Sequence, residues 1–221
     1  MTSTIATITT TRLSKRFADG VDVLDGAQVT TSGGRLTLIR GEPGSGRTTL
    51  TRCLTGVYRP DTGEVTLRLG RGTVDLTTAD PRTVAWVRAH HIAAFDGPLA
   101  AAPILTAQAA VARAAGCTRA GALAGLTRLG VADAAHTQLG RLRAAQRHTV
   151  ALAATLLAER PVIVLDGPDE YAPLPALTSW LTEAVAAGAA VVVTAAAHGP
   201  LESIATAVGE LRKGKIAWHT V

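Results

Sequence analysis

Cysteine and aromatic side chains are scarce in this sequence. It has two cysteines among 221 residues, and only 3% of the residues are Phe, Trp or Tyr. Cys53 and Cys117 lie far apart without metal-ligand spacing, which argues against a disulfide framework or a zinc site. We therefore expect a protein of the reducing cytoplasm, with a core built from aliphatic residues and alanine.

Long apolar runs are also missing. The uncharged stretch from Ala184 to Ala197 is too short and too rich in alanine for a membrane-spanning helix, which needs about 20 apolar residues. The chain opens without the pattern of a secretory signal. Any association with a membrane is therefore expected to come through a partner protein.

The net charge is +5, but the basic residues are scattered and no aromatic ladder accompanies them. A nucleic-acid footprint is one interpretation of this charge, and a solvated basic surface is the favoured one. We expect no direct binding of nucleic acid.

Short apolar runs alternate with longer helical patterns, which is typical of a parallel sheet covered by helices. The expected strands are 36–39, 64–69, 92–95, 162–165 and 189–193, the expected helices are 48–54 and 177–187, and 211–218 is expected to form a hairpin or an edge strand. Leucines at 123, 126 and 129 place a helical pattern within residues 98–158. We expect one domain over 1–221, with a core of 1–97 and 159–221 and a helical subdomain at about 98–158.

A glycine-rich loop follows the strand at 36–39 and opens a helix. Its candidate binding residues are Gly41, Gly44, Ser45, Gly46, Arg47, Thr48 and Thr49. Glycines let backbone amides turn around an anion, and the start of a helix adds its dipole at the same point. This pattern predicts a phosphate-binding loop, or P-loop, with the Thr48 hydroxyl on Mg²⁺. The alternative is a strand-to-helix turn without a ligand.

Arg47 stands where such loops usually have lysine. A lysine is a compact point charge that fits between two phosphates, whereas a guanidinium is wide and planar. We expect Arg47 to preserve phosphate binding and to position the terminal phosphate poorly.

With this loop, the segments Leu13-Ser14-Lys15-Arg16-Phe17 and Arg59-Pro60-Asp61-Thr62-Gly63 resemble those of ATP-binding-cassette (ABC) ATPases. The resemblance covers almost the whole chain. It implies an α/β P-loop NTPase fold with a parallel core sheet, antiparallel N-terminal strands and an inserted helical subdomain. It also implies ATP or ADP and Mg²⁺ as ligands, an adenine platform at Phe17, and a homo- or heterodimer with another ABC-type subunit.

Within that family, two segments resemble the accessory ATP-binding proteins of phosphonate carbon–phosphorus lyase systems. They are Val74-Asp75-Leu76-Thr77-Thr78-Ala79 with Arg82-Thr83-Val84, and Gly188-Ala189-Ala190-Val191-Val192. This resemblance implies a carbon–phosphorus lyase complex as a possible partner, beside the membrane permease that ABC transporters use.

The resemblance assigns Asp166, at the end of the apolar run 162–165, to Mg²⁺, but it also exposes a missing group. The family has a glutamate at the next position, where it polarises the attacking water, and this chain has Gly167. Losing a positioned general base costs about 10²- to 10⁴-fold in rate. Asp169 and Glu170 follow closely, and either could reach back if the loop folds differently. We expect instead that a glutamate displaced by three residues is a solvated turn residue.

At other positions too, this chain lacks the side chain that the family uses for catalysis or for the dimer contact. The glutamine after strand 92–95 falls at Asp96-Gly97, the switch histidine after Thr194 falls at Ala195-Ala196 with His198 nearest, and Tyr171-Ala172-Pro173 replaces the dimer-loop aspartate. The signature segment reads Leu142-Arg143-Ala144-Ala145-Gln146, so Arg143 and Gln146 are the candidates to face the phosphate held by the opposite protomer. For Arg143 the favoured alternative is a side chain that faces solvent.

These observations predict an ABC-type subunit that binds Mg-ATP, hydrolyses it weakly or not at all, and acts in assembly or regulation. The alternative is an active ATPase that energises an ABC transporter or a phosphonate-degradation complex, with a heterodimer partner supplying missing groups. A third possibility is a structural partner that no longer binds nucleotide.

Overall fold

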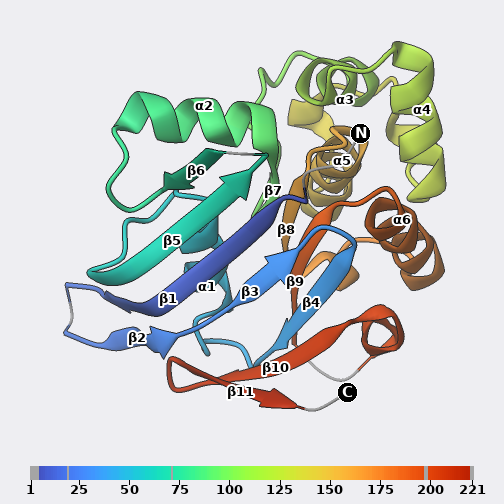
Figure 1. The fold of residues 1–221 in the computed structure, drawn as a ribbon. Coiled ribbons are helices and arrows are strands. Elements are labelled where there is room, and N and C mark those ends of the chain that lie inside the picture. The colour runs from blue at the N-terminus through green and yellow to red at the C-terminus, as the bar shows by residue number, and fades with distance from the viewer. Residues whose placement is uncertain (1–4, 19, 71, 197–198, 220–221) are drawn as a thin grey trace.

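The computed structural model describes residues 5–18, 20–70, 72–196 and 199–219, which form two sheets and a set of helices (Figure 1). The strands are β1 (Thr7–Arg16), β2 (Asp22–Ala27), β3 (Thr30–Ser32), β4 (Arg35–Arg40), β5 (Thr62–Leu69), β6 (Gly72–Asp75), β7 (Ile92–Phe95), β8 (Val162–Asp166), β9 (Ala190–Ala195), β10 (Ala207–Arg212) and β11 (Lys215–His219). The helices are α1 (Arg47–Leu54), α2 (Pro81–His91), α3 (Ala107–Ala115), α4 (Arg119–Arg128), α5 (Ala144–Leu157) and α6 (Leu174–Ala186), with short 3-10 helices η1 (Ala132–Ala134), η2 (Leu139–Arg141), η3 (Pro168–Glu170) and η4 (Pro200–Ile204).

The central sheet has the strand order β11-β10-β4-β9-β8-β7. All neighbours are parallel except β10 and β11, which form a hairpin around Lys213 and Gly214. This hairpin is longer than the predicted 211–218 because its first strand also pairs with β4. Because β4 lies between β10 and β9, the glycine-rich loop that follows β4 leaves the sheet from an interior strand.

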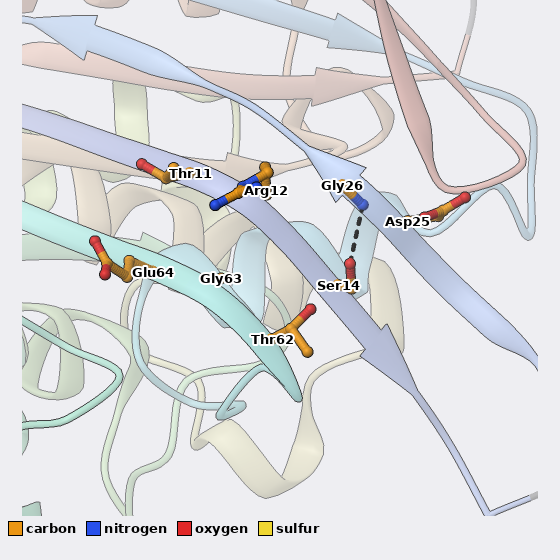
Figure 2. A pocket seen from close by; sticks show the side chains of 8 residues that line it. All are labelled: Thr11, Arg12, Ser14, Asp25, Gly26, Thr62, Gly63 and Glu64. Carbon is orange, nitrogen blue, oxygen red and sulfur yellow. Dashed lines mark hydrogen bonds between the residues drawn. The ribbon is translucent and has the colours of Figure 1, made fainter.

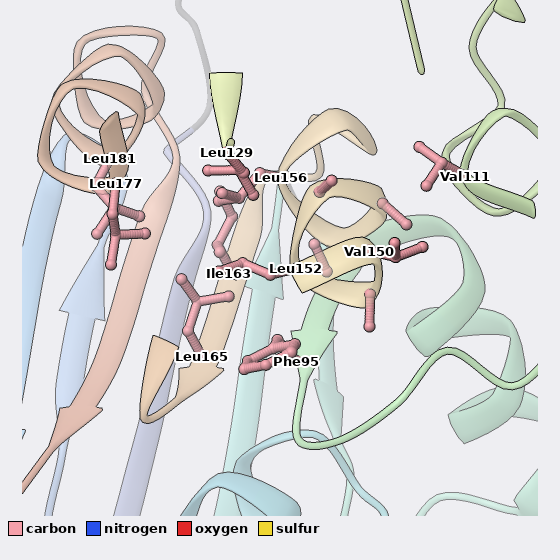
Figure 3. Close-up of a cluster of buried hydrophobic side chains, with 14 of the residues drawn as sticks. Phe95, Val111, Leu129, Val150, Leu152, Leu156, Ile163, Leu165, Leu177 and Leu181 are labelled. Carbon is pink, nitrogen blue, oxygen red and sulfur yellow. The ribbon is translucent and has the colours of Figure 1, made fainter. Parts of the chain in front are cut away.

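Apolar side chains of the central sheet are buried on both faces. In β8, Ile163 and Leu165 join one hydrophobic cluster, and Val162 and Val164 join the other. Figure 3 shows the first cluster, where Ile163 and Leu165 lie among leucines of α5 and α6. This alternation follows from the two-residue period of a strand, and it explains why the run 162–165 is apolar without interruption.

The second sheet is antiparallel, with the order β2-β1-β5-β6 and with β3 paired to β1. It packs over the cluster that contains Val162 and Val164. The predicted fold class, a parallel core sheet with antiparallel N-terminal strands and a helical subdomain, is confirmed.

The helical subdomain consists of α3, α4 and α5, which pack on one another, while α5 also contacts β7. Within residues 98–158 the first helix begins at Ala107. The subdomain boundaries at about 98 and 158 stay a prediction. No helix in the described part of the chain is long and apolar enough to cross a membrane.

Candidate functional site

The glycine-rich loop joins β4 to α1 through a tight turn. Gly44 and Gly46 have φ angles of 81° and 104°, a region that favours glycine. A Cβ on Gly46 would lie 2.8 Å from the carbonyl oxygen of Val23 in β2, and a Cβ on Gly41 would meet the Ser45 hydroxyl. These glycines are therefore required by backbone angle and by close packing.

The start of α1 leaves hydrogen-bond donors available. Its N-cap residue, Gly46, gives the helix no side-chain cap, and the first amides of a helix have no acceptor within that helix. Ser45 Oγ and Arg47 Nη1 are both buried without a hydrogen-bond partner among the described residues. A buried polar group without a partner costs about 1–3 kcal/mol, and a charged one costs more. An anion with several oxygens fits this set of donors.

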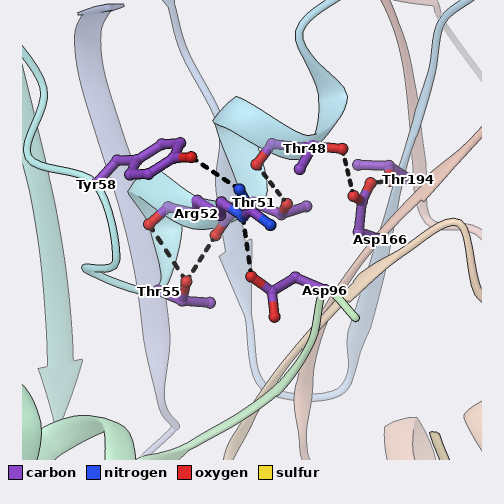
Figure 4. Close-up of polar contacts among 8 residues, drawn as sticks. All are labelled: Thr48, Thr51, Arg52, Thr55, Tyr58, Asp96, Asp166 and Thr194. Atoms are coloured by element: carbon purple, nitrogen blue, oxygen red, sulfur yellow. Dashed lines mark hydrogen bonds and ion pairs between the residues drawn. The ribbon is translucent and has the colours of Figure 1, made fainter. Parts of the chain in front are cut away.

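Two residues predicted to serve a metal lie in direct contact. Thr48, in the first turn of α1, donates a 2.6 Å hydrogen bond from Oγ1 to Oδ2 of Asp166, at the end of β8 (Figure 4). The other carboxylate oxygen accepts a 2.6 Å bond from the hydroxyl of Thr194 on β9, and Thr194 also accepts from the Gly167 amide at 3.2 Å. Thr194 is fully buried, and its positioning role was not predicted.

This pair fits Mg²⁺, which prefers oxygen ligands and commonly keeps several waters beside one or two protein groups. A hydroxyl and a carboxylate side by side at the start of α1 provide such oxygens. No group of three or more His, Cys, Asp or Glu residues that could hold a metal occurs within the described ranges. The site therefore suits a metal that is shared with bound phosphate, and it does not form an all-protein metal cage.

Phe17, the predicted adenine platform, follows β1 and is 38% exposed. Its ring lies edge-on to Tyr58 at 5.7 Å between centroids, and the Lys15 ammonium lies 5.7 Å from its centre. An open hollow of about 600 Å³ is lined by Phe17 and neighbouring residues of β1 and β2. The exposed ring beside this hollow can stack on a planar base.

Asp96, at the family's glutamine position, forms an ion pair with Arg52 of α1. One of its oxygens accepts a 3.0 Å hydrogen bond from Nε of Arg52, and Arg52 also donates to the Tyr58 hydroxyl at 2.8 Å (Figure 4). The Tyr58 bond and then the Asp96 bond raise the pKa of Arg52, while burial opposes them. Because Tyr58 contacts Phe17, this network links the end of β7 to the adenine platform, a link that was not predicted.

The signature candidates lie on another part of the chain. Gln146 Oε1 accepts a 3.1 Å hydrogen bond from the Arg143 amide, so this glutamine caps the start of α5, and the Arg143 side chain is exposed. Helix α5 packs on α3, α4 and β7, whereas α1 packs on β8, β1 and β2. A single chain therefore does not bring Arg143 and Gln146 to the loop, and any contact with phosphate would have to come from a second protomer.

The two remaining family positions carry different side chains. Ala195 ends β9, and His198 lies outside the described residues. Tyr171, at the dimer-loop position, stacks on His148 of α5 with centroids 4.4 Å apart and lies edge-on to Phe95. His148 was not predicted, since its ring partners Phe95 and Tyr171 come from two other segments of the chain.

Another open hollow, of about 550 Å³, lies over β1, β2 and β5 (Figure 2). Its lining includes Arg12, Asp25 and Glu64, and the Ser14 hydroxyl at its edge accepts a 3.0 Å bond from the Gly26 amide. None of the predicted binding residues lines this hollow. The candidate site is therefore the one built around α1 and β8.

Comparisons with known proteins agree with this geometry. The family model described as "ABC transporter" matches residues 24–170, more than half of the chain. The cytochrome c biogenesis ATP-binding export protein CcmA of Nitrobacter winogradskyi is 29% identical over 204 residues, which cover 90% of this chain and 94% of that protein. The aliphatic sulfonates import ATP-binding protein SsuB 1 of Pseudomonas fluorescens is 32% identical over 167 residues, which cover 76% of this chain and 56% of that protein.

A solved structure shows the same fold. It is the dimeric post-hydrolysis state of the ATP-binding cassette MJ0796 bound to ADP and Pi, with a TM-score of 0.82 at 18% sequence identity, covering 96% of this chain and 98% of that one. The chain therefore belongs to the ABC transporter family, as an ATP-binding subunit of the ABC type.

Proposed function

We propose that this chain binds Mg-ATP through its variant loop, hydrolyses it slowly, and energises a membrane transporter. The observation that carries the proposal is the start of α1, where Ser45 Oγ and Arg47 Nη1 are buried without partners in the described structure. Thr48, which lies on the same turn of the helix, contacts Asp166 at the end of β8. The relatives' names, which include an export and an import ATP-binding protein, support a role in transport.

We assign the roles as follows. The phosphates are held by Gly41, Gly44, Ser45, Gly46, Arg47, Thr48 and Thr49; adenine stacks on Phe17; Mg²⁺ is held by Thr48 and oriented by Asp166; and Arg143 and Gln146 face the nucleotide of a second protomer. Mg²⁺ would neutralise charge on the phosphate oxygens during hydrolysis. The partners are then a second ABC-type subunit and a membrane permease, which would hold this chain at the cytoplasmic face of a membrane.

Slow turnover follows from the side chains around the phosphates. Gly167 and Ala195 offer no carboxylate or imidazole, and Asp96 is engaged by Arg52. Each group that is missing from the reacting centre removes charge stabilisation or proton transfer.

A second candidate function is a regulatory or assembly subunit that binds ATP without turning it over, and Gly167 favours it. Nucleotide would then stabilise an interface by binding alone. A single-turnover assay separates the two functions, because the transport function requires hydrolysis above the uncatalysed background and the regulatory function does not.

A place beside a carbon–phosphorus lyase complex also stays a proposal. It rests on the segment from Val74 to Ala79 with Arg82-Thr83-Val84, and on the segment from Gly188 to Val192. In the first of these segments, the Asp75 carboxylate accepts hydrogen bonds from the Thr77 amide at 2.8 Å and from the Thr78 hydroxyl at 2.8 Å, which gives these residues a structural role in a turn. The names of the relatives, which are an import and an export ATP-binding protein, favour a transporter over a lyase complex.

The proposed binding is tested by thermal unfolding with and without Mg-ATP. A ligand at 100 times its Kd stabilises the folded state by about 2.7 kcal/mol, which raises the Tm by several degrees. We expect this rise for the wild-type chain and its loss in Gly46→Asp, because a side chain at position 46 is disfavoured by the φ angle of 104° and would clash with the Val23 carbonyl oxygen, which would distort the loop. An unchanged Tm for the wild type would favour a structural partner that does not bind nucleotide.

A further inference from the structure

The turn after Asp166 folds a glutamate back over Gly167. Gly167 adopts φ 56° and ψ 47°, and the 3-10 helix η3 follows it directly. The Glu170 amide donates a 3.3 Å hydrogen bond to the Gly167 carbonyl. In a 3-10 turn, residues three apart lie one above the other, so position 170 lies over position 167. Glu170 is exposed, as expected for a solvated turn residue, and it also reaches back toward residue 167, which was the less favoured alternative.

The Glu170 carboxylate lies within contact distance of the point where a side chain on residue 167 would begin. A Cβ built on Gly167 would be 3.5 Å from Oε1 of Glu170 and 3.8 Å from its carboxyl carbon. This separation is similar to the reach of a glutamate side chain from its own Cβ. Because Glu170 is exposed, water can reach its carboxylate. The turn thus brings a carboxylate next to the position that lacks one.

Both ends of the turn are anchored. At its start, the Gly167 amide donates to the carbonyl oxygen of Thr194 at 3.0 Å, and the hydroxyl of Thr194 bonds to Asp166. At its end, the Tyr171 carbonyl accepts a 2.7 Å bond from the Thr149 hydroxyl of α5. These bonds give the turn a defined position relative to Asp166.

Tyr171 lies close to the same carboxylate. Burial, then the charge of Glu170 and a hydrogen bond with it, raises the pKa of Tyr171. The Tyr171 ring is in turn stacked on His148. The phenol can therefore hold the Glu170 carboxylate near Gly167, and α5 holds the phenol.

We propose that Glu170 replaces the missing glutamate at position 167 and activates the water that attacks ATP. This inference rests on the proposed function. The water oxygen forms a bond to the γ-phosphorus, and the bond from that phosphorus to the β–γ bridging oxygen breaks. Its electron pair leaves with ADP, and Glu170 accepts the proton of the water and then releases it to the phosphate product or to solvent.

The test is single-turnover hydrolysis of Mg-ATP by the full chain and its variants. Glu170→Gln keeps the shape of the side chain and removes the proton acceptor, so we expect the rate to fall by about 10²-fold or more with the ATP affinity unchanged. Glu64→Gln is the matched control on the exposed antiparallel sheet. Asp169→Asn tests the neighbouring carboxylate, and we expect it to keep the wild-type rate. Adding Gly167→Glu to Glu170→Gln should restore part of the rate.

Three results would overturn the inference: a wild-type rate kept by Glu170→Gln, a loss caused by Asp169→Asn instead, or a wild-type chain that binds ATP without hydrolysing it. Failure of the proposed function is seen in the wild type alone, as absent ATP binding or as binding without hydrolysis. Failure of the inference by itself is seen as hydrolysis by the wild type that Glu170→Gln does not reduce. Equal ATP affinities in the wild type and the four variants exclude misfolding as the cause of a lost rate.

Discussion

Thr48 and Asp166 lie 118 positions apart in the sequence, and their side chains form a 2.6 Å hydrogen bond. One belongs to the first turn of α1 and the other ends β8, so the order of the central strands creates the pair. The contact joins the phosphate loop to the carboxylate predicted to orient Mg²⁺.

Replacing Asp166 with Asn removes the carboxylate charge at nearly constant shape. Changing a residue that orients metal ligands typically costs 10- to 100-fold in metal affinity, so we expect the Mg²⁺ concentration needed for half-maximal ATP binding to rise by about that factor. A Mg²⁺ titration at fixed nucleotide measures this, with Asp133→Asn as the exposed control. Equal Mg²⁺ dependence in both variants would exclude Asp166 from the metal site.

Arg47 tests how the variant loop holds phosphate. Hydrogen bonds to charged groups contribute about 1.5–3 kcal/mol, so we expect Arg47→Ala to weaken ATP binding about 10- to 100-fold. Arg47→Lys should keep most of the affinity and raise the hydrolysis rate, because an ammonium fits between two phosphates. Binding competition measures the affinities, and Arg113→Ala on α3 is the control. Unchanged affinity in Arg47→Ala would show that the guanidinium does not contact the nucleotide.

The buried thiol of Cys53 is expected to make the free energy of unfolding decrease at alkaline pH. Burial raises the pKa of its thiol from 9.0 to about 12. Between these values the unfolded state has released the proton and the folded state has kept it, so stability is retained below pH 9 and falls as the pH rises through this window. The fall is at most about 1.4 kcal/mol per pH unit.

Denaturant unfolding from pH 8 to 11 measures the Cys53 effect. We expect Cys53→Ala to show a shallower decline than wild type, and Cys117→Ala to follow wild type, since that thiol is only partly buried. Parallel declines in wild type and Cys53→Ala would contradict the assignment.

Leu152 on α5 tests the packing of the helical subdomain against the sheet. It is fully buried in the cluster that contains Ile163 (Figure 3). Removing a buried leucine to its Cβ typically costs 2–5 kcal/mol, and we expect Leu152→Ala to lose about that much unfolding free energy. Ile104, which is 73% exposed, provides the control Ile104→Ala, with a change within about 0.5 kcal/mol. Similar losses in both variants would contradict this packing.

Local sequence patterns were sufficient for the elements that carry the loop. The apolar run 36–39, the glycines and the threonines predict β4, the turn and α1 because each depends on neighbouring residues only. Helix α2 was not predicted, although its start carries a local signal. Asp80 precedes Pro81, and its carboxylate accepts bonds from the Arg82 and Thr83 amides, a helix N-cap.

Contacts between distant segments could not be predicted in this way. Thr194 is one polar residue in an apolar strand, and its role depends on the pairing of β8 with β9. The Asp96–Arg52 ion pair depends on where β7 ends relative to α1. The position of Glu170 over Gly167 depends on the 3-10 turn, which the sequence around Pro168 does not specify by itself.

The central claim is that the start of α1 binds nucleotide phosphates although Arg47 replaces lysine. Titration calorimetry of the purified chain with ATP and Mg²⁺ tests it most directly. The expected result is saturable heat from one site per chain, absent in a folded Gly46→Asp variant. No heat from either ATP or ADP, or equal heat in wild type and Gly46→Asp, would contradict the claim.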